Sequence, residues 1–335
     1  MKHSLQVLDQ VVVMDQLSQL SLPSIREIEE ELLIRSIRKA AMAGDLSDLP
    51  GLSRVAAALE PSTRQAFIAA VAQARNAVSL NALAEAIQSG QVTRMEAELQ
   101  LEMLQQELDR NLRAPILNGF LRGASFANSV LEAQIGTALR FDLINPHAVA
   151  FAARHVPQLA ESVVVGGRER IQQILVEATE GNLTVDSAAR RIRDSLGLTT
   201  RDSRFLDRFE RSLQDRGITG TILATRVEKM REALIRRRSL TIARTELIRA
   251  GNGGQQALWM ESLSQGLIDR ALTYREWVVT HDDRLDIQVC EPLDGATAGL
   301  TEPFTHPYGL GAFLHPPAHP NCRCAVVLRY RRTPS

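Results

Sequence analysis

The sequence predicts a mainly α-helical protein that ends in a small α+β unit containing cysteine and histidine. Leu, Ala, Arg, Glu and Gln dominate the composition and favour helices, whereas aromatic residues make up only 4%. Apolar residues recur at helical spacing along most of residues 24–265. All three cysteines, Cys290, Cys322 and Cys324, lie in the last part of the chain, where β-favouring runs replace the helical pattern.

The overall composition is typical of a globular protein and indicates no particular binding partner. At 335 residues the chain can bury a sizeable core and is expected to form two or three units. Its 44% apolar and 23% charged residues are ordinary for a globular protein, and its formal net charge is zero. Because no run of 18 apolar residues occurs, no membrane span is predicted. Changes in composition divide the chain into residues 1–140, 141–268 and 269–335.

The first region is expected to hold an arm followed by helices. Residues 1–22 lack a consistent helical phase and are interpreted as the arm. Ser24 and Glu27 have the spacing of a capping box, which predicts a helix that ends near Gly44.

Two further helices are expected to pack as an antiparallel hairpin. The first runs from about Thr63 to Gln88, after Pro61, and Gly90 closes it. A capping box at Thr93 and Glu96 opens the second, whose apolar stripe is typical of a buried helix face. The stripe consists of Ala97, Leu101, Leu104, Leu108 and Leu112.

The middle region, residues 141–268, is expected to contain a series of separate helices. Asn145–Pro146 starts a new helix because proline is favoured in a first turn, and Pro157 and Gly166–Gly167 are interpreted as breaks. A helical segment at 116–144 leads into this region, and further helical segments are expected at 168–180, 184–195, 201–216, 221–238 and 239–265, the last weakened by Gly251, Gly253 and Gly254.

The C-terminal region is expected to contain at least two strands. Residues 273–280 are rich in β-favouring side chains that alternate between apolar and polar, and residues 325–330 form a second such run. Trp259 and Trp277 are interpreted as core anchors rather than binding platforms.

Charge is distributed unevenly along the chain. Residues 1–135 carry 12 basic and 16 acidic residues, net −4, whereas residues 188–250 carry 16 basic and 8 acidic residues, net +8. The basic segment could contact double-stranded DNA without reading its sequence, or an acidic partner. The alternative is a set of solvated helix faces with internal ion pairs. The candidate residues are Arg190, Arg191, Arg193, Arg236, Arg237 and Arg238.

Several separated motifs occur in a fixed order from residue 145 onward. They are Asn145–Pro146, Ile242–Ala–Arg–Thr–Glu246, Trp259, Trp277, Asp283–Arg284, Cys290 with Leu293–Asp294–Gly295, and Pro317–Ala–His–Pro–Asn–Cys–Arg–Cys324. In this order they resemble the phage Mu F-like family of minor head proteins, also called phage head morphogenesis proteins. Family members often carry a CxxC pair before the LDG turn. Here only Cys290 is present, Ile287 occupies the partner position, and Asp286 could substitute for it.

The resemblance implies a structural virion protein without enzymatic activity. Such proteins are packaged inside the phage head near the portal protein, after assembly in the host cytoplasm, and they influence head assembly or DNA ejection. The resemblance therefore implies the portal and other head proteins as partners. A helical adaptor with no role in nucleic-acid binding is a further alternative.

The terminal cysteines and histidines are candidates for a structural zinc site. Zinc prefers four tetrahedral Cys or His ligands, and it would stabilise a unit too small to fold by apolar burial alone. The candidates are Cys290, Cys322, Cys324 and one of His319, His315, His306 or Asp286. The alternative is a proline-rich fold with free thiols, or with a disulfide from Cys290 to Cys322 or Cys324.

Two features of the C-terminal region are compatible with catalysis instead of a structural role. His281–Asp282 is compatible with a metal-dependent hydrolase of the nuclease type, but no second His–Asp pattern accompanies it. Cys290 as a nucleophile would need a histidine base within reach. Arg244 and Glu246 are two residues apart on a helix, so they face different directions, and Arg244 is expected to anchor the terminal unit.

Overall fold

A computed structural model describes residues 50–331, apart from residues 92, 96–98, 143–144 and 282–284. The predicted arm at 1–22, the helix from Ser24 to Gly44 and the residues Glu96, Ala97 and Asp282 to Arg284 lie outside this part of the chain.

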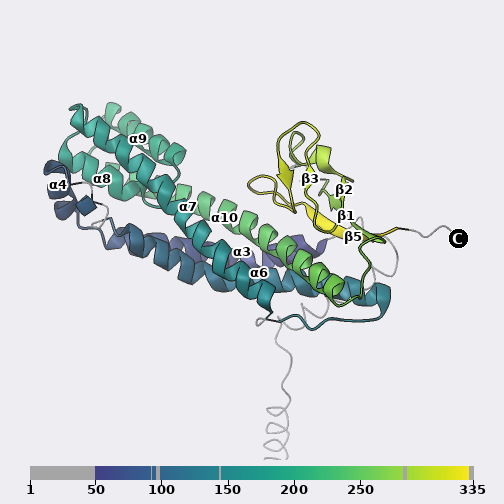
Figure 1. The fold of residues 1–335 in the computed structure, drawn as a ribbon. Helices are drawn as coiled ribbons and strands as arrows, with labels where there is room; N and C mark the ends of the chain where they lie inside the picture. Colours follow the sequence, from purple (N-terminus) through teal and green to yellow (C-terminus); the bar gives the residue numbers. More distant parts are fainter. Residues whose placement is uncertain (1–49, 92, 96–98, 143–144, 282–284, 332–335) are drawn as a thin grey trace, which may run out of the picture.

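The described residues form an elongated helical body with a small β-containing unit beside one end of it (Figure 1). The mainly helical class with a C-terminal unit that holds Cys and His is therefore confirmed. The helices of the body are α3 (Pro50–Asn76), α4 (Leu80–Gln88), α6 (Leu101–Ile135), α7 (Pro146–Thr179), α8 (Val185–Ser195), α9 (Thr200–Asp215) and α10 (Gly220–Ser264). None of the helices in the described residues is long and apolar enough to cross a membrane.

The core of the body lies between α3, α6, α7 and α10. Leu101, Leu104, Leu108 and Leu112 are all at most 2% exposed, so the predicted stripe forms the buried face of α6. α3 runs antiparallel to α6 and α10, as the predicted hairpin required, and this places its residue Leu59 beside Gly119 of α6.

The predicted break at Pro61 is wrong, because α3 continues through this residue. Next to the proline, the hydroxyls of Ser62 and Thr63 both donate to the Leu59 carbonyl, at 3.0 and 2.8 Å. The segment from Thr63 to Gln88 is instead divided after Asn76, where Ser79 caps α4 by accepting from the Ala82 amide.

α7 also continues through its predicted breaks. Its start is as predicted, since the Asn145 side chain accepts from the His147 amide at 2.9 Å. Pro157 and Gly166–Gly167 are nevertheless inside the helix. A continuous buried face from Val156 to Ile174 packs into the core, and this tertiary packing outweighs the local preference to break. In the same way α6 passes through Pro115.

α10 is a single helix of 45 residues where two helices were expected. Gly251 and Gly254 do not weaken it but let it approach α6 closely. A Cβ atom at Gly254 would lie 2.9 Å from the Ala124 amide nitrogen and closer still to the Phe120 carbonyl oxygen. At Gly123 of α6 it would lie 2.6 Å from Gly251 Cα. These glycines are therefore packing residues of the contact between the two helices.

The C-terminal unit is built around a three-stranded antiparallel sheet in the order β2-β1-β5. β1 (Thr273–Val278) is central and pairs with β5 (Ala325–Tyr330) in a register that sets Trp277 opposite Val326. Both of these strands were predicted. The other strands have only two residues each and were not: they are β2 (Thr297–Ala298), β3 (Phe304–Thr305) and β4 (Ala312–Phe313), of which the last two pair as a hairpin.

A second apolar cluster joins this unit to the helical body. It brings Trp259 of α10, which is 3% exposed, together with Trp277 of β1, which is fully buried, and with Leu131 of α6. All three cysteines belong to this cluster. The thiols are therefore part of the contact between the unit and the body rather than of its outer surface.

Candidate functional site

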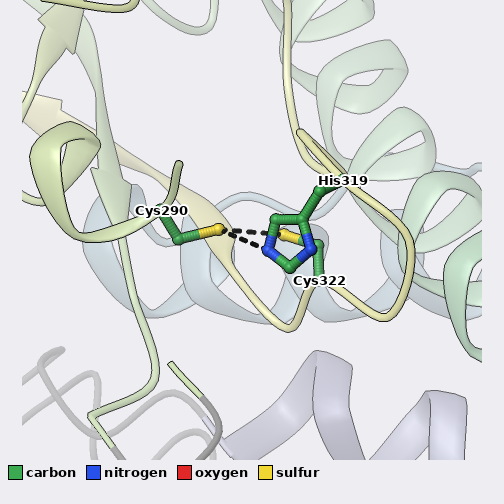
Figure 2. A group of neighbouring side chains, drawn as sticks. All are labelled: Cys290, His319 and Cys322. Atoms are coloured by element: carbon green, nitrogen blue, oxygen red, sulfur yellow. Dashed lines mark hydrogen bonds between the residues drawn. The ribbon is translucent and has the colours of Figure 1, made fainter. Parts of the chain in front are cut away.

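Two of the three cysteines and one histidine converge in the C-terminal unit, and we call Cys290, His319 and Cys322 the Cys–His cluster. Cys290 Sγ lies 3.7 Å from Cys322 Sγ and 2.9 Å from His319 Nε2. The three donor atoms all lie within 4.8 Å of one another. Figure 2 shows the Cys290 side chain pointing at the other two from the opposite side. All three thiols of the unit are free and buried.

The imidazole of His319 has a fixed orientation. Its Nδ1 donates to the Pro320 carbonyl at 2.8 Å, because a carbonyl oxygen can only accept. In the neutral ring, Nε2 then carries the lone pair, and it is this atom that faces the sulfurs. This is the arrangement in which a backbone carbonyl orients a metal-binding histidine.

The three thiols share their protons unequally. Hydrogen bonds from the neighbouring thiols of Cys290 and Cys324 lower the pKa of Cys322, whereas hydrogen bonding to Cys322 raises the pKa of Cys290. The hydrogen bond with Cys322 also raises the pKa of His319. One thiolate, on Cys322, is therefore favoured within the group, and such a thiolate next to an imidazole is a good ligand for a soft or borderline cation.

Cys324 and Asp286, two further candidate ligands, lie near the cluster and differ in their contacts. Cys324 is buried beside Cys290 and His319 in a pocket of about 10 Å³. Asp286 Oδ1 accepts from the Gln288 and Val289 amides at 3.0 and 2.9 Å, so it holds the turn before Cys290 and is not part of the cluster.

His306 and His315 do not join the cluster either. His306 is 1% exposed, and its Nδ1 accepts from the Tyr308 amide. His315 Nδ1 donates to the Pro316 carbonyl at 2.7 Å, and burial lowers the pKa of this imidazole to about 4. His306 therefore holds the turn between β3 and β4, and His315 lies in the loop that follows β4.

The Leu293–Asp294–Gly295 turn closes the end of β1. Asp294 Oδ1 accepts from the Val279 amide at 3.1 Å, and its Oδ2 lies 3.0 Å from His281 Nε2. Gly295 has a φ of 70°, which favours glycine, and its amide donates to the Trp277 carbonyl. His281 is therefore an exposed partner of the turn and lies outside the Cys–His cluster.

Polar contacts attach the loop that carries His319 and Cys322 to α10. The Asn321 amide donates to Thr245 Oγ1 at 3.0 Å, and its side chain donates to Thr241 Oγ1 at 3.4 Å. Asn252, 1% exposed, donates to the Cys324 carbonyl at 3.3 Å and accepts from the Val326 amide at 3.1 Å. These contacts could not be predicted from the motifs that surround Asn252 and Asn321 in the sequence.

Arg244 and Glu246 bond different neighbours, as their spacing implies, but the expected partner of Arg244 is wrong. Its Nε donates to Glu60 Oε2 of α3 at 2.8 Å, so it connects two helices of the body and does not anchor the terminal unit. Glu246 accepts from Arg249 and lies 2.6 Å from His155 Nε2 of α7.

Most of the six candidate arginines bond acids or carbonyls within the chain. Arg191 pairs with Glu177, and Arg193 with Asp194. Arg236 pairs with Glu232, and Arg237 with Asp202. Two others bond uncharged groups: Arg190 donates to Ser187 Oγ, and Arg238 to the Gly197 carbonyl. Burial lowers the pKa of Arg238 to about 10.

A different set of arginines faces solvent along α9. Arg201, Arg204, Arg208 and Arg211 are all exposed. Their spacing of three, four and three residues places them on one face of the helix. No ion pair joins any of them to an acid within the described residues. We call this set the α9 arginine stripe.

One comparison with known proteins gives a match. The sequence model of the phage Mu protein F like family matches residues 203–327, which run from α9 through α10 to β5. No characterised protein and no solved structure matches the chain. The matched residues include the Ile242–Glu246 motif, the Asp294–Gly295 turn and all three cysteines. The match over residues 203–327 therefore supports the resemblance to the phage Mu F-like family that the sequence motifs indicated.

Proposed function

We propose that this chain is a minor head protein that assembles in the host cytoplasm, is packaged inside the phage head near the portal, and contacts both the portal protein and the packaged DNA. The observation that carries this proposal is the family match over residues 203–327. A role in head assembly or genome ejection would follow from such a position.

The side chains of the matched region support an architectural role. Asn252 and Asn321 attach the terminal loop to α10, and Asp294 closes the end of β1. These motif residues connect elements of the protein to one another rather than face a large cleft. A rigid connection of this kind suits a component of an assembly.

A metal-dependent or thiol hydrolase is the less favoured alternative. His319 is within reach of Cys290, but Cys290 is 2% exposed and its pKa is raised, whereas a nucleophilic cysteine needs access and a lowered pKa. The pocket beside it, of about 10 Å³, has room for about one water molecule and not for a nucleic-acid substrate.

Portal binding is tested by co-purification. The full chain, co-expressed with the portal protein of the same phage, is expected to remain bound to it through size-exclusion chromatography. A matched control replaces the portal with the major capsid protein. Separate elution of chain and portal, with both folded, would contradict the proposed portal contact.

The α9 arginine stripe is the surface best suited to DNA. Of the four acids of the same helix, Glu210 is half-buried and Asp215 is exposed. The other two are buried, where Asp207 pairs with Arg170 and Asp202 pairs with Arg237. Their charges are therefore compensated inside the protein, whereas the stripe remains available. Over ten residues it extends about 15 Å along the helix, which suits contact with several phosphates without reading bases.

Replacement of the four stripe arginines by glutamine is expected to remove most of the affinity for duplex DNA. Four phosphate contacts give a slope of log Kobs against log salt of about −3.6 for the unmodified chain, and the variant should have a slope near zero. The measurement is fluorescence anisotropy with a labelled duplex over a salt series.

The control variant is Arg140→Gln, because the Arg140 side chain is 91% exposed and pairs with Asp142 away from α9. It should change neither affinity nor slope. An unmodified chain with no salt-dependent binding would remove the DNA contact from the proposed function and leave the portal contact untouched.

A further inference from the structure

We propose that Cys290, His319, Cys322 and Cys324 bind one structural zinc ion, which cross-links the loop of residues 315–324 to the turn before η1 (Glu291–Leu293) and so holds the C-terminal unit on α10. The proposal does not rest on the function proposed above, because it follows from donor atoms and their positions alone.

The distance between the sulfurs is the one that a tetrahedral zinc requires. Two thiolates bound at about 2.3 Å lie about 3.8 Å apart, and Cys290 Sγ and Cys322 Sγ are 3.7 Å apart. A disulfide would need a separation of about 2.0 Å. Across one zinc ion a sulfur and an imidazole nitrogen lie about 3.6 Å apart. His319 Nε2 is 2.9 Å from Cys290 Sγ, so the ring would move outward by several tenths of an ångström.

Groups around the cluster are arranged as they are around known types of zinc site. The Pro320 carbonyl accepts from His319 Nδ1 and directs the Nε2 lone pair at the sulfurs. Trp277 is fully buried in the apolar cluster that also holds the three cysteines, and its Nε1 has no hydrogen-bond partner in the described part of the chain. A buried indole N–H without a partner in this cluster would be available to a metal-bound thiolate.

Cys324 is assigned as the fourth ligand. Its thiol is buried and lines the same small pocket as Cys290 and His319, although it lies outside the group of donor atoms within 4.8 Å of one another, so binding the ion would draw it closer. Asp286 is the competing candidate, but its Oδ1 holds two backbone amides of the turn, and coordination through this oxygen would release them. The ligand set is therefore Cys3His, which is common in closed structural sites.

The cross-link would join segments that have few other means of staying together. β2, β3 and β4 have two residues each, and the loop between β4 and β5 has no regular structure until Ala325. The same loop contacts α10 through Asn321 and Asn252. The free energy of zinc binding would therefore stabilise the contact between the unit and the long helix.

The first measurement is the metal content of the full chain purified without chelator. About one zinc per chain is expected, together with a cobalt-substituted form whose absorption shows tetrahedral coordination by three thiolates. Removal of zinc with phenanthroline should expose residues 315–324 to proteases and change tryptophan fluorescence, because both tryptophans lie in the adjacent apolar cluster. Far-UV circular dichroism should hardly change, because the helical body does not depend on the ion.

Ligand variants complete the test. Cys290→Ser, Cys322→Ser and His319→Ala should each lower zinc affinity about 100-fold or more, and Cys324→Ser should remove one thiolate from the cobalt spectrum. Two controls, Asp286→Asn and His281→Ala, should bind as the unmodified chain does. Less than one zinc per ten chains, no cobalt spectrum, or a disulfide from Cys290 to Cys322 in the purified chain would overturn the proposal, and none of these three measurements requires a variant to fold.

Discussion

Replacement of Gly254 by alanine is expected to destabilise the protein by about 3 kcal/mol or more, near the upper end for overpacking. The new Cβ would meet the backbone of Phe120 and Ala124 on α6, which cannot move aside as a flexible side chain can. The two helices must separate, and the apolar contacts along their length are weakened. In a domain of this size the midpoint of thermal unfolding should fall by about 6–12 °C.

The matched control is Gly166→Ala in α7. This glycine is also inside a helix, but a Cβ atom there meets no other atom within 4 Å. Alanine has the better helix propensity, so this variant should be unchanged or more stable by up to about 1 kcal/mol. Thermal unfolding is followed by circular dichroism at 222 nm. Equal midpoints for the two variants would show that α6 and α10 are not in close backbone contact.

Replacement of Arg275 by methionine is expected to cost about 3–5 kcal/mol in the stability of the C-terminal unit. This β1 side chain is fully buried and donates to the carbonyls of Gly299, Leu314 and Glu302. It also donates to Gln256 of α10 at 3.0 Å. Burial lowers the pKa of Arg275 to about 10, so the side chain keeps its charge at neutral pH. Methionine would fill part of the volume but leave these buried acceptors without a donor.

Arg329→Met is the control, because Arg329 on the adjacent strand β5 makes a partly exposed ion pair with Glu276. Its loss should cost no more than about 1 kcal/mol. Since Trp259 and Trp277 are the only tryptophans of the chain and both lie in the cluster that joins unit and body, their fluorescence reports unfolding of the unit. Two variants with the same urea midpoint by fluorescence would contradict the role assigned to Arg275.

The sequence predicted helix identity better than helix length. The leucine stripe of α6 and the helix starts at Asn145 and near residue 184 are as predicted, because these patterns depend on residues close in sequence. Proline and glycine were misread as breaks at Pro61, Pro157 and Gly166–Gly167. Whether such residues end a helix depends on the surface that the helix buries, and this surface is supplied by elements distant in sequence.

The sequence also identified the residues of the candidate site more reliably than their arrangement. Cys290 and Cys322 are 32 residues apart, and only the antiparallel pairing of β1 with β5 brings their loops together. Composition alone could not distinguish the solvent-facing arginines of α9 from the ion-paired arginines of α8 and α10. Which face of α9 is exposed to solvent is decided by its packing against the other helices. The role of Arg275 could not be predicted from the sequence, since its partners are backbone carbonyls in two later loops.

Because α10 is one continuous helix, it restricts the insertions and deletions that the matched region can accept. One helix carries Arg237, which pairs with α9, and Thr245 and Asn252, which hold the terminal loop. Each residue inserted between these positions would rotate one set of contacts by about 100° relative to the other and shift it by about 1.5 Å. Relatives should therefore differ in this stretch by whole numbers of turns, near seven or eleven residues, or not at all.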